Sequence, residues 1–152
     1  MKLLKKMTLS ALFIISVTSD CFAENIDYPK NLWKGLIGEA VSEFTKFGYS
    51  AGYESMYASA CVYRKRFHEG EHFPWGCVAL TRKDLDQFVG RERQKYKDTA
   101  KEIIRKVFIE NGPDITDGAT HYENVEKFGL PKGWEKMKKI KKIGSHTYFK
   151  EK

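Results

Sequence analysis

The most conspicuous chemical pattern in the sequence is His68-Glu69-Gly70-Glu71-His72, two histidines four residues apart with a glutamate after the first. On a helix, this spacing places both imidazoles on one face to bind zinc, and the glutamate can activate a metal-bound water. Gly70 lies inside the pattern and Pro74 follows it closely, which disfavours a continuous helix. We therefore expect a polar surface loop over residues 67–76, without a metal or cofactor, and keep a zinc metallopeptidase using His68, Glu69 and His72 as an alternative function.

A second pattern is the glutamate pair Glu39 and Glu43, which lies at one margin of the apolar half of a predicted helix. Mutual repulsion and apolar neighbours both raise the pKa of a carboxyl group. A carboxyl group that stays protonated near neutral pH can protonate a glycosidic oxygen as the bond breaks. The spacing alone is weak evidence for catalysis, because most glutamate pairs on helices are simply solvated.

A third pattern lies nearer the C-terminus, where the sequence contains Gly-Ala-Thr-His-Tyr at residues 118–122, then Trp134, then Ile-Gly-Ser-His-Thr-Tyr-Phe at residues 143–149. Together with Gly-Glu-Ala at residues 38–40, with Glu43 and with a helix over Tyr53–Arg66, this order resembles the spore-cortex-lytic, or SleB-type, cell-wall hydrolase family. The resemblance covers roughly residues 33–149, nearly the whole chain after its first segment.

The resemblance implies a compact lysozyme- or transglycosylase-like domain that cleaves the glycan strands of peptidoglycan between N-acetylmuramic acid and N-acetylglucosamine. By position, Glu39 matches the catalytic glutamate of that family and Glu43 the second acid of its motif. The segments that line the family's cleft correspond here to Thr120, His121, Tyr122 and His146, which we expect to bind substrate.

The expected chemistry is that of a lytic transglycosylase with one catalytic glutamate. Glu39 would protonate the glycosidic oxygen and then, as a carboxylate, assist attack of the C6 hydroxyl of muramic acid on the anomeric carbon, which yields a 1,6-anhydro product. Hydrolysis by the usual route needs a second carboxylate at a defined distance from the first, and this distance cannot be read from a sequence. Tyr122, Trp134 and Tyr148 offer faces on which sugar rings could pack.

Hydrophobic periodicity indicates the elements that would position these residues. Residues 134–142 are rich in lysine and are interpreted as a solvated face. Together the patterns predict an α+β fold, a helical body with a small C-terminal antiparallel sheet. The expected helices are Leu32–Phe47, Tyr53–Arg66, a short one through Leu85 and Phe88 opened by a capping box at Thr81–Asp84, and Tyr96–Phe108, and the expected strands are Ala119–Asn124 and Ser145–Phe149.

The N-terminal segment is typical of a signal peptide. Three lysines within residues 1–6 precede the apolar run Met7–Val17, which is shorter than the roughly 20 residues needed to cross a membrane. Cleavage after Ala23 would leave a single catalytic domain, residues 24–152, without stable membrane insertion. We expect an exported protein, located in the periplasm, outside the cell or in the cell wall.

The charge of the chain is consistent with such a location. The formal net charge is +7, and removal of residues 1–23 would take away three lysines and one aspartate, leaving +5. A basic, aromatic-rich chain could bind nucleic acid, but export favours anionic envelope polymers instead. We expect a monomer that acts on peptidoglycan glycan strands, and a non-catalytic basic wall-binding module is the other alternative.

Two cysteines, Cys61 and Cys77, would remain after removal of the signal peptide. An even pair in an exported chain suggests a disulfide, which would contribute about 3 kcal/mol to stability in the chain-entropy model. The alternative is two buried free thiols.

Overall fold

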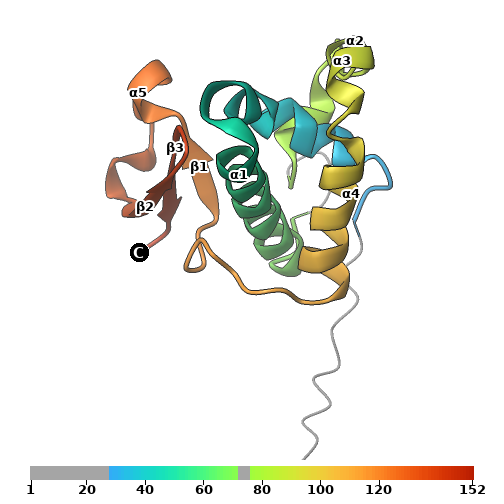
Figure 1. Cartoon of the computed structure of the whole chain (residues 1–152). Coiled ribbons are helices and arrows are strands. Elements are labelled where there is room, and N and C mark those ends of the chain that lie inside the picture. The colour runs from blue at the N-terminus through green and yellow to red at the C-terminus, as the bar shows by residue number, and fades with distance from the viewer. Residues whose placement is uncertain (1–27, 72–75) are drawn as a thin grey trace, which may run out of the picture.

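Helix α1 (Leu32–His68) dominates the computed structural model, which describes residues 28–71 and 76–152 (Figure 1). The helix bends at Gly48, whose φ of 85° and ψ of −179° are not helical. Glycine accepts a positive φ at little steric cost because it has no Cβ atom. The two segments of α1 on either side of Gly48 correspond to the two predicted helices, which are thereby confirmed, although the second begins directly after the bend and not at Tyr53.

The helices between α1 and the sheet in the chain, over residues 78–109, pack on one side of α1 (Figure 1). The predicted helix Tyr96–Phe108 is confirmed by α4 (Lys97–Ile104), which continues as the π-helical turn η2 (Arg105–Ile109). The centroid of the Tyr96 ring lies 4.3 Å from that of the Phe44 ring in α1. Apolar side chains from α1 and α4 form the main core. The shorter elements before α4 are η1 (Val78–Thr81), α2 (Leu85–Phe88) and α3 (Arg91–Gln94).

The predicted capping box at Thr81–Asp84 is wrong, although the short helix that it was expected to open is present as α2. The hydroxyl of Thr81 donates to the carbonyl of Val78, and Asp84 is the N-cap of α2 without capping it through its side chain. Asp84 instead pairs with Arg82, 2.9 Å away. Arg82 therefore binds the carboxylate that would otherwise be available to cap the helix.

The sheet has three antiparallel strands in the order β1 (His121–Glu123), β3 (His146–Lys150), β2 (Lys138–Ile143). The two predicted strands correspond to β1 and β3. The solvated face predicted over residues 134–142 is confirmed, because each of these residues is exposed or partly exposed, but the segment also forms η3 (Trp134–Lys136) and most of β2, which were not predicted. Helix α5 (Val125–Phe128) was not predicted either. β2 lies at an edge of the sheet, so exposed lysine side chains are compatible with its backbone pairing to β3.

The sheet packs against the second segment of α1, opposite α4 (Figure 1). A second apolar cluster joins Ala58 and Val62 of α1 to Ala119, Ile143 and Tyr148. The α+β class, with a helical body and a small antiparallel sheet, is confirmed. Its likeness to lysozyme stays a prediction.

Within the described ranges, no helix combines the length and apolar character needed to cross a bilayer. The predicted signal peptide, residues 1–23, lies outside the described residues, as do His72 and Pro74 of the zinc pattern. The loop predicted over residues 67–76 begins later than expected, because α1 extends to His68.

The predicted disulfide between Cys61 and Cys77 does not form in the structure, where both cysteines are buried free thiols. The Cys61 thiol is directed to the carbonyl of Pro113, with Sγ 3.8 Å from the oxygen. The Cys77 thiol instead interacts with Tyr63. Because residues two apart on a helix point in nearly opposite directions, a thiol beside Tyr63 lies on the other side of α1 from Cys61.

This arrangement predicts that both cysteines stay unmodified in the folded protein and react only after unfolding. Burial raises the pKa of Cys61 to about 11 and that of Cys77 to about 12, and the protonated thiol is a poor nucleophile. Peptide mass mapping after alkylation, with and without denaturant and without reductant, would measure this. If both cysteines of the denatured protein are alkylated only after treatment with a reductant, the two form a disulfide.

Candidate active site

A pocket of about 270 Å³ lies between α1 and the sheet, and Glu39 contributes to its wall. Side chains from both segments of α1, from the sheet and from the short helices η1 and η3 converge on it. Residues distant in sequence thus share one concave site, as expected of a binding or catalytic centre. The lining residues are Glu39, Tyr63, Arg66, Val78, Tyr122, Glu123, Trp134 and His146.

The carboxyl group of Glu39 is held in an environment that favours its protonated form. Glu39 is half-buried at the margin of the apolar face of α1, and burial is the main reason that its pKa is raised. The charge of Glu123 raises the pKa further, whereas the charge of Arg66 lowers it. A carboxyl group with a raised pKa in a pocket is a candidate general acid.

Two tyrosines place hydroxyl groups beside this carboxyl. The hydroxyl oxygens of Tyr63 and Tyr122 are 2.8 Å apart, and both hydroxyls hydrogen-bond to Glu39 in a way that lowers its pKa. Burial, and then the charge of Glu39, raise the pKa of Tyr122 well above its usual range, and the same two causes act on Tyr63. The phenols therefore stay protonated and can stabilise a carboxylate at Glu39.

Arg66 is fixed in place beside the pocket by backbone contacts. Its Nε donates to the carbonyl of Thr120 (2.7 Å) and its Nη1 to that of Gly76 (3.5 Å). The first bond ties α1 to the residue before β1, and the second ties it to the chain just before η1. They also hold a positive charge where it acts on Glu39.

Trp134 supplies an aromatic face to the pocket wall. Its ring is half-exposed and packs edge-on against His121 (5.0 Å between centroids) and Phe149 (5.5 Å). Trp134 is therefore suited to contact a sugar. Tyr148, predicted as another sugar-packing face, is fully buried and cannot contact a ligand.

His146 reaches the pocket from β3. Its ring packs edge-on against Tyr122, with centroids 5.2 Å apart. Burial lowers the pKa of His146, and the charge of Glu43 opposes that shift. Among the described residues, no hydrogen-bond partner satisfies its buried Nδ1 atom. A neutral imidazole there can exchange a hydrogen bond with a ligand.

Glu43 does not line the pocket, so its predicted contact with substrate is wrong. Only 1% of its surface is exposed, and its Oε2 accepts the backbone N–H of Ser145 at 2.9 Å. The repulsion expected to raise the pKa of Glu39 also comes from a different residue, because the carboxylate that raises this pKa is Glu123 and not Glu43. Glu43 instead joins α1 to the turn between β2 and β3.

Thr120 and His121 line a neighbouring pocket of about 370 Å³ rather than the Glu39 pocket. The Thr120 hydroxyl lies 2.9 Å from Nδ1 of His121, whose ring contacts Trp134. His121 of this pocket and Trp134 of the Glu39 pocket are therefore in contact. Of the five predicted substrate-binding residues, only Tyr122 and His146 lie beside Glu39.

The sequence predictions missed Tyr63, Arg66 and Glu123. Tyr63 and Arg66 are three residues apart on α1, a spacing that places both on one helix face. That spacing could have indicated that Tyr63 and Arg66 contribute to the same site. Glu123 follows Tyr122 directly, but nothing in its local sequence indicates that it faces Glu39 across the pocket.

The zinc pattern forms no metal site within residues 28–71 and 76–152, where no three potential ligands are grouped to hold a metal ion. Glu69, the residue expected to activate water, pairs with Lys65 at 2.9 Å. His72 lies outside the described residues, so the full pattern is not represented.

Comparison with known proteins does not assign the chain to a family. No family model matches it, and neither a curated protein nor a solved structure does so. The function of the site is therefore argued from the geometry and electrostatics of its own residues.

Proposed function

We propose that the chain cleaves the glycan strands of peptidoglycan as a lytic transglycosylase, with Glu39 as its general acid and base. The observation that carries this proposal is the environment of Glu39, a half-buried carboxyl with a raised pKa in a pocket that also presents an aromatic ring and hydrogen-bonding groups. Saccharide sites commonly combine these features, because aromatic faces pack on sugar rings while polar groups bind hydroxyl and acetamido groups.

The proposed reaction uses Glu39 twice. Protonated Glu39 donates its proton to the glycosidic oxygen as the bond to the anomeric carbon breaks. The C6 hydroxyl of the same muramic acid then bonds to the anomeric carbon and returns its proton to Glu39. Arg66, Tyr63 and Tyr122 lower the pKa of Glu39 and so stabilise the carboxylate formed between these steps.

Glu123 favours hydrolysis as a second candidate reaction of the same pocket. It is the only other acidic side chain in the pocket wall among the described residues, and its charge acts on Glu39. Glycosidases that hydrolyse by the usual route use two carboxyl groups, one as the acid and one as nucleophile or base. Glu123 could take the second role.

Mass spectrometry of purified peptidoglycan digested with the protein distinguishes the two reactions. A transglycosylase releases 1,6-anhydro ends and keeps this activity when Glu123 is changed to glutamine. A two-carboxylate hydrolase releases reducing ends and loses activity in Glu123→Gln. Release of neither product would contradict the proposal and favour a non-catalytic wall-binding module. Chelator-sensitive cleavage of peptide bonds would favour the zinc peptidase.

The raised pKa of Glu39 predicts the pH at which kcat/KM falls on the alkaline limb of the pH profile, and predicts that this pH depends on the charge of Arg66. A general acid must be protonated, so kcat/KM should fall as pH rises through the pKa of Glu39, which lies above its usual 4.5. Arg66→Gln removes a charge that lowers this pKa and should move the limb to higher pH. The matched control is Arg105→Gln, since Arg105 is exposed and pairs with Glu110. An unchanged limb in Arg66→Gln would contradict the assignment of that limb to Glu39.

A further inference from the structure

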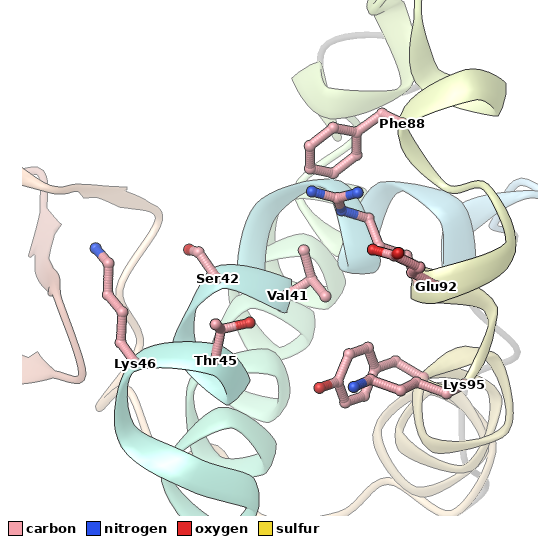
Figure 2. Close-up of a pocket in the computed structure, with 9 residues that line it drawn as sticks. Val41, Ser42, Thr45, Lys46, Phe88, Glu92 and Lys95 are labelled. Atoms are coloured by element: carbon pink, nitrogen blue, oxygen red, sulfur yellow. The ribbon is translucent and has the colours of Figure 1, made fainter.

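A third pocket, of about 400 Å³, lies where the first segment of α1 faces the region of α2–α4 (Figure 2). Figure 2 shows Val41 and Thr45 of α1 on one wall, with Phe88, Glu92 and Lys95 from the region of α2–α4 on the other. The proposed reaction at Glu39 makes no use of these side chains.

The charges in this pocket are mostly positive. Arg93 and Lys95 line it together with a single acid, Glu92, whereas Lys46 lies at its edge with its amine directed toward the sheet (Figure 2). Among the described residues, no carboxylate forms an ion pair with any of these three cations, whereas many other cations of the chain, such as Arg82, are paired. The pocket therefore offers unpaired positive charge to an anionic ligand.

Aromatic rings hold two of these cations in place. The guanidinium carbon of Arg93 lies 4.2 Å from the centroid of the Phe88 ring, and Nζ of Lys95 lies 4.8 Å from that of Tyr96. Such contacts restrict the side chain while leaving its N–H groups free to bind. A guanidinium fixed in this way can bind a carboxylate through two parallel hydrogen bonds.

The pocket is connected to the Glu39 site by α1 itself. Residues three and seven positions after Glu39 lie on the same stripe of a helix. These are Ser42 and Lys46, which both lie at the edge of the third pocket. Lys46 also lies close enough to His146, in the Glu39 pocket, for its charge to lower the pKa of that histidine. A chain bound at Glu39 could therefore extend a substituent past Ser42 and Lys46 into the third pocket.

We infer that this pocket binds the peptide attached to the glycan strand, with Arg93 and Lys95 contacting its carboxylates and Glu92 contacting a free amino group. The inference rests on the proposed function, because the peptide of peptidoglycan is carried by the muramic acid residue whose bond Glu39 would cleave. A ligand with several carboxylates and one amino group matches Arg93, Lys95 and the single acid of the pocket. A simple polyanion would leave Glu92 facing like charge.

Calorimetric titration of the full chain tests this inference. The Glu39→Gln variant keeps ligands intact, and the two probes are a disaccharide carrying a tetrapeptide with one free amino group and the same disaccharide without peptide. The peptide should tighten binding about tenfold or more, and Arg93→Gln with Lys95→Gln should remove that gain. The matched control removes two exposed charges elsewhere, by Lys101→Gln with Lys138→Gln, and should keep the gain.

Two further arms sharpen the test. Glu92→Gln should abolish any preference for the peptide with a free amino group over its acetylated form. Glycerol phosphate oligomers should compete with the peptide weakly, and strong competition that depends on Arg93 would overturn the inference in favour of a phosphate polymer. Equal affinity for both disaccharides, or no binding of either, would also overturn it. Peptide-dependent binding without any cleavage by the parent chain would contradict the proposed function alone.

Discussion

Changing Glu39 to glutamine should lower the release of soluble fragments from purified peptidoglycan by at least about 10²-fold, the lower end of what general acid–base catalysis contributes. Glutamine keeps the size of the side chain but can neither donate the proton to the glycosidic oxygen nor accept one afterwards. Initial rates of fragment release, followed by chromatography with mass spectrometry, measure the effect.

The same variant should be at least as stable as the parent near neutral pH. A pKa raised in the folded state means that folding favours protonated Glu39, so the stability it contributes is lost as pH rises from about 4.5 through its folded-state pKa. Glutamine does not ionise, so the stability advantage of the variant should shrink as pH falls toward that value. Thermal unfolding at several pH values measures this.

Glu54→Gln is the matched control, because Glu54 is an exposed glutamate on the same helix. It should leave both the rate of fragment release and the stability unchanged. Equal fragment release by the parent and Glu39→Gln would remove Glu39 from the mechanism, whatever the unfolding data show.

The helical part of the fold could be predicted because its apolar periodicity is strong. Phe44 and the residues around it repeat at three- and four-residue steps, and Gly48 marks the bend between the segments of α1. The edge strand β2 could not be predicted in the same way, since its four lysines mask the alternation expected of a half-buried strand. Pairing with β3, a contact between chain segments, makes it a strand.

Glu39, Tyr122 and His146, which the sequence predictions assigned to one site, line one pocket, and their roles in cleavage stay predictions. Glu43 was wrongly predicted to contact substrate. Four-residue spacing places Glu39 and Glu43 side by side on the helix, and contacts with another part of the chain decide which of the two is buried. Here that part is the turn at Ser145, 102 residues later in the chain. Such contacts depend on tertiary packing, so the sequence alone does not reveal them.

The burial of Glu43 leads to the second prediction with a large effect, that Glu43→Ala should lower the free energy of unfolding by about 3 kcal/mol. Truncation leaves a cavity and removes the acceptor of the Ser145 N–H. The site is closely packed, because a Cβ atom built at Gly144 would lie 2.4 Å from Oε2 of Glu43. Denaturant titration measures the loss, and Glu54→Ala, an exposed change on the same helix, should stay within about 0.5 kcal/mol of the parent.

Amide hydrogen exchange at Ser145 separates loss of this contact from general destabilisation. Glu43→Gln keeps an oxygen that can accept the N–H, so it should retain more protection at Ser145 than Glu43→Ala when both are measured well below their unfolding midpoints. Because His146 follows Ser145 directly, loss of the contact should also disturb the wall of the Glu39 pocket and reduce cleavage. Unchanged stability and unchanged exchange in Glu43→Ala would show that the sheet is held against α1 without the Glu43 contact, and that Glu43 has no part in positioning His146.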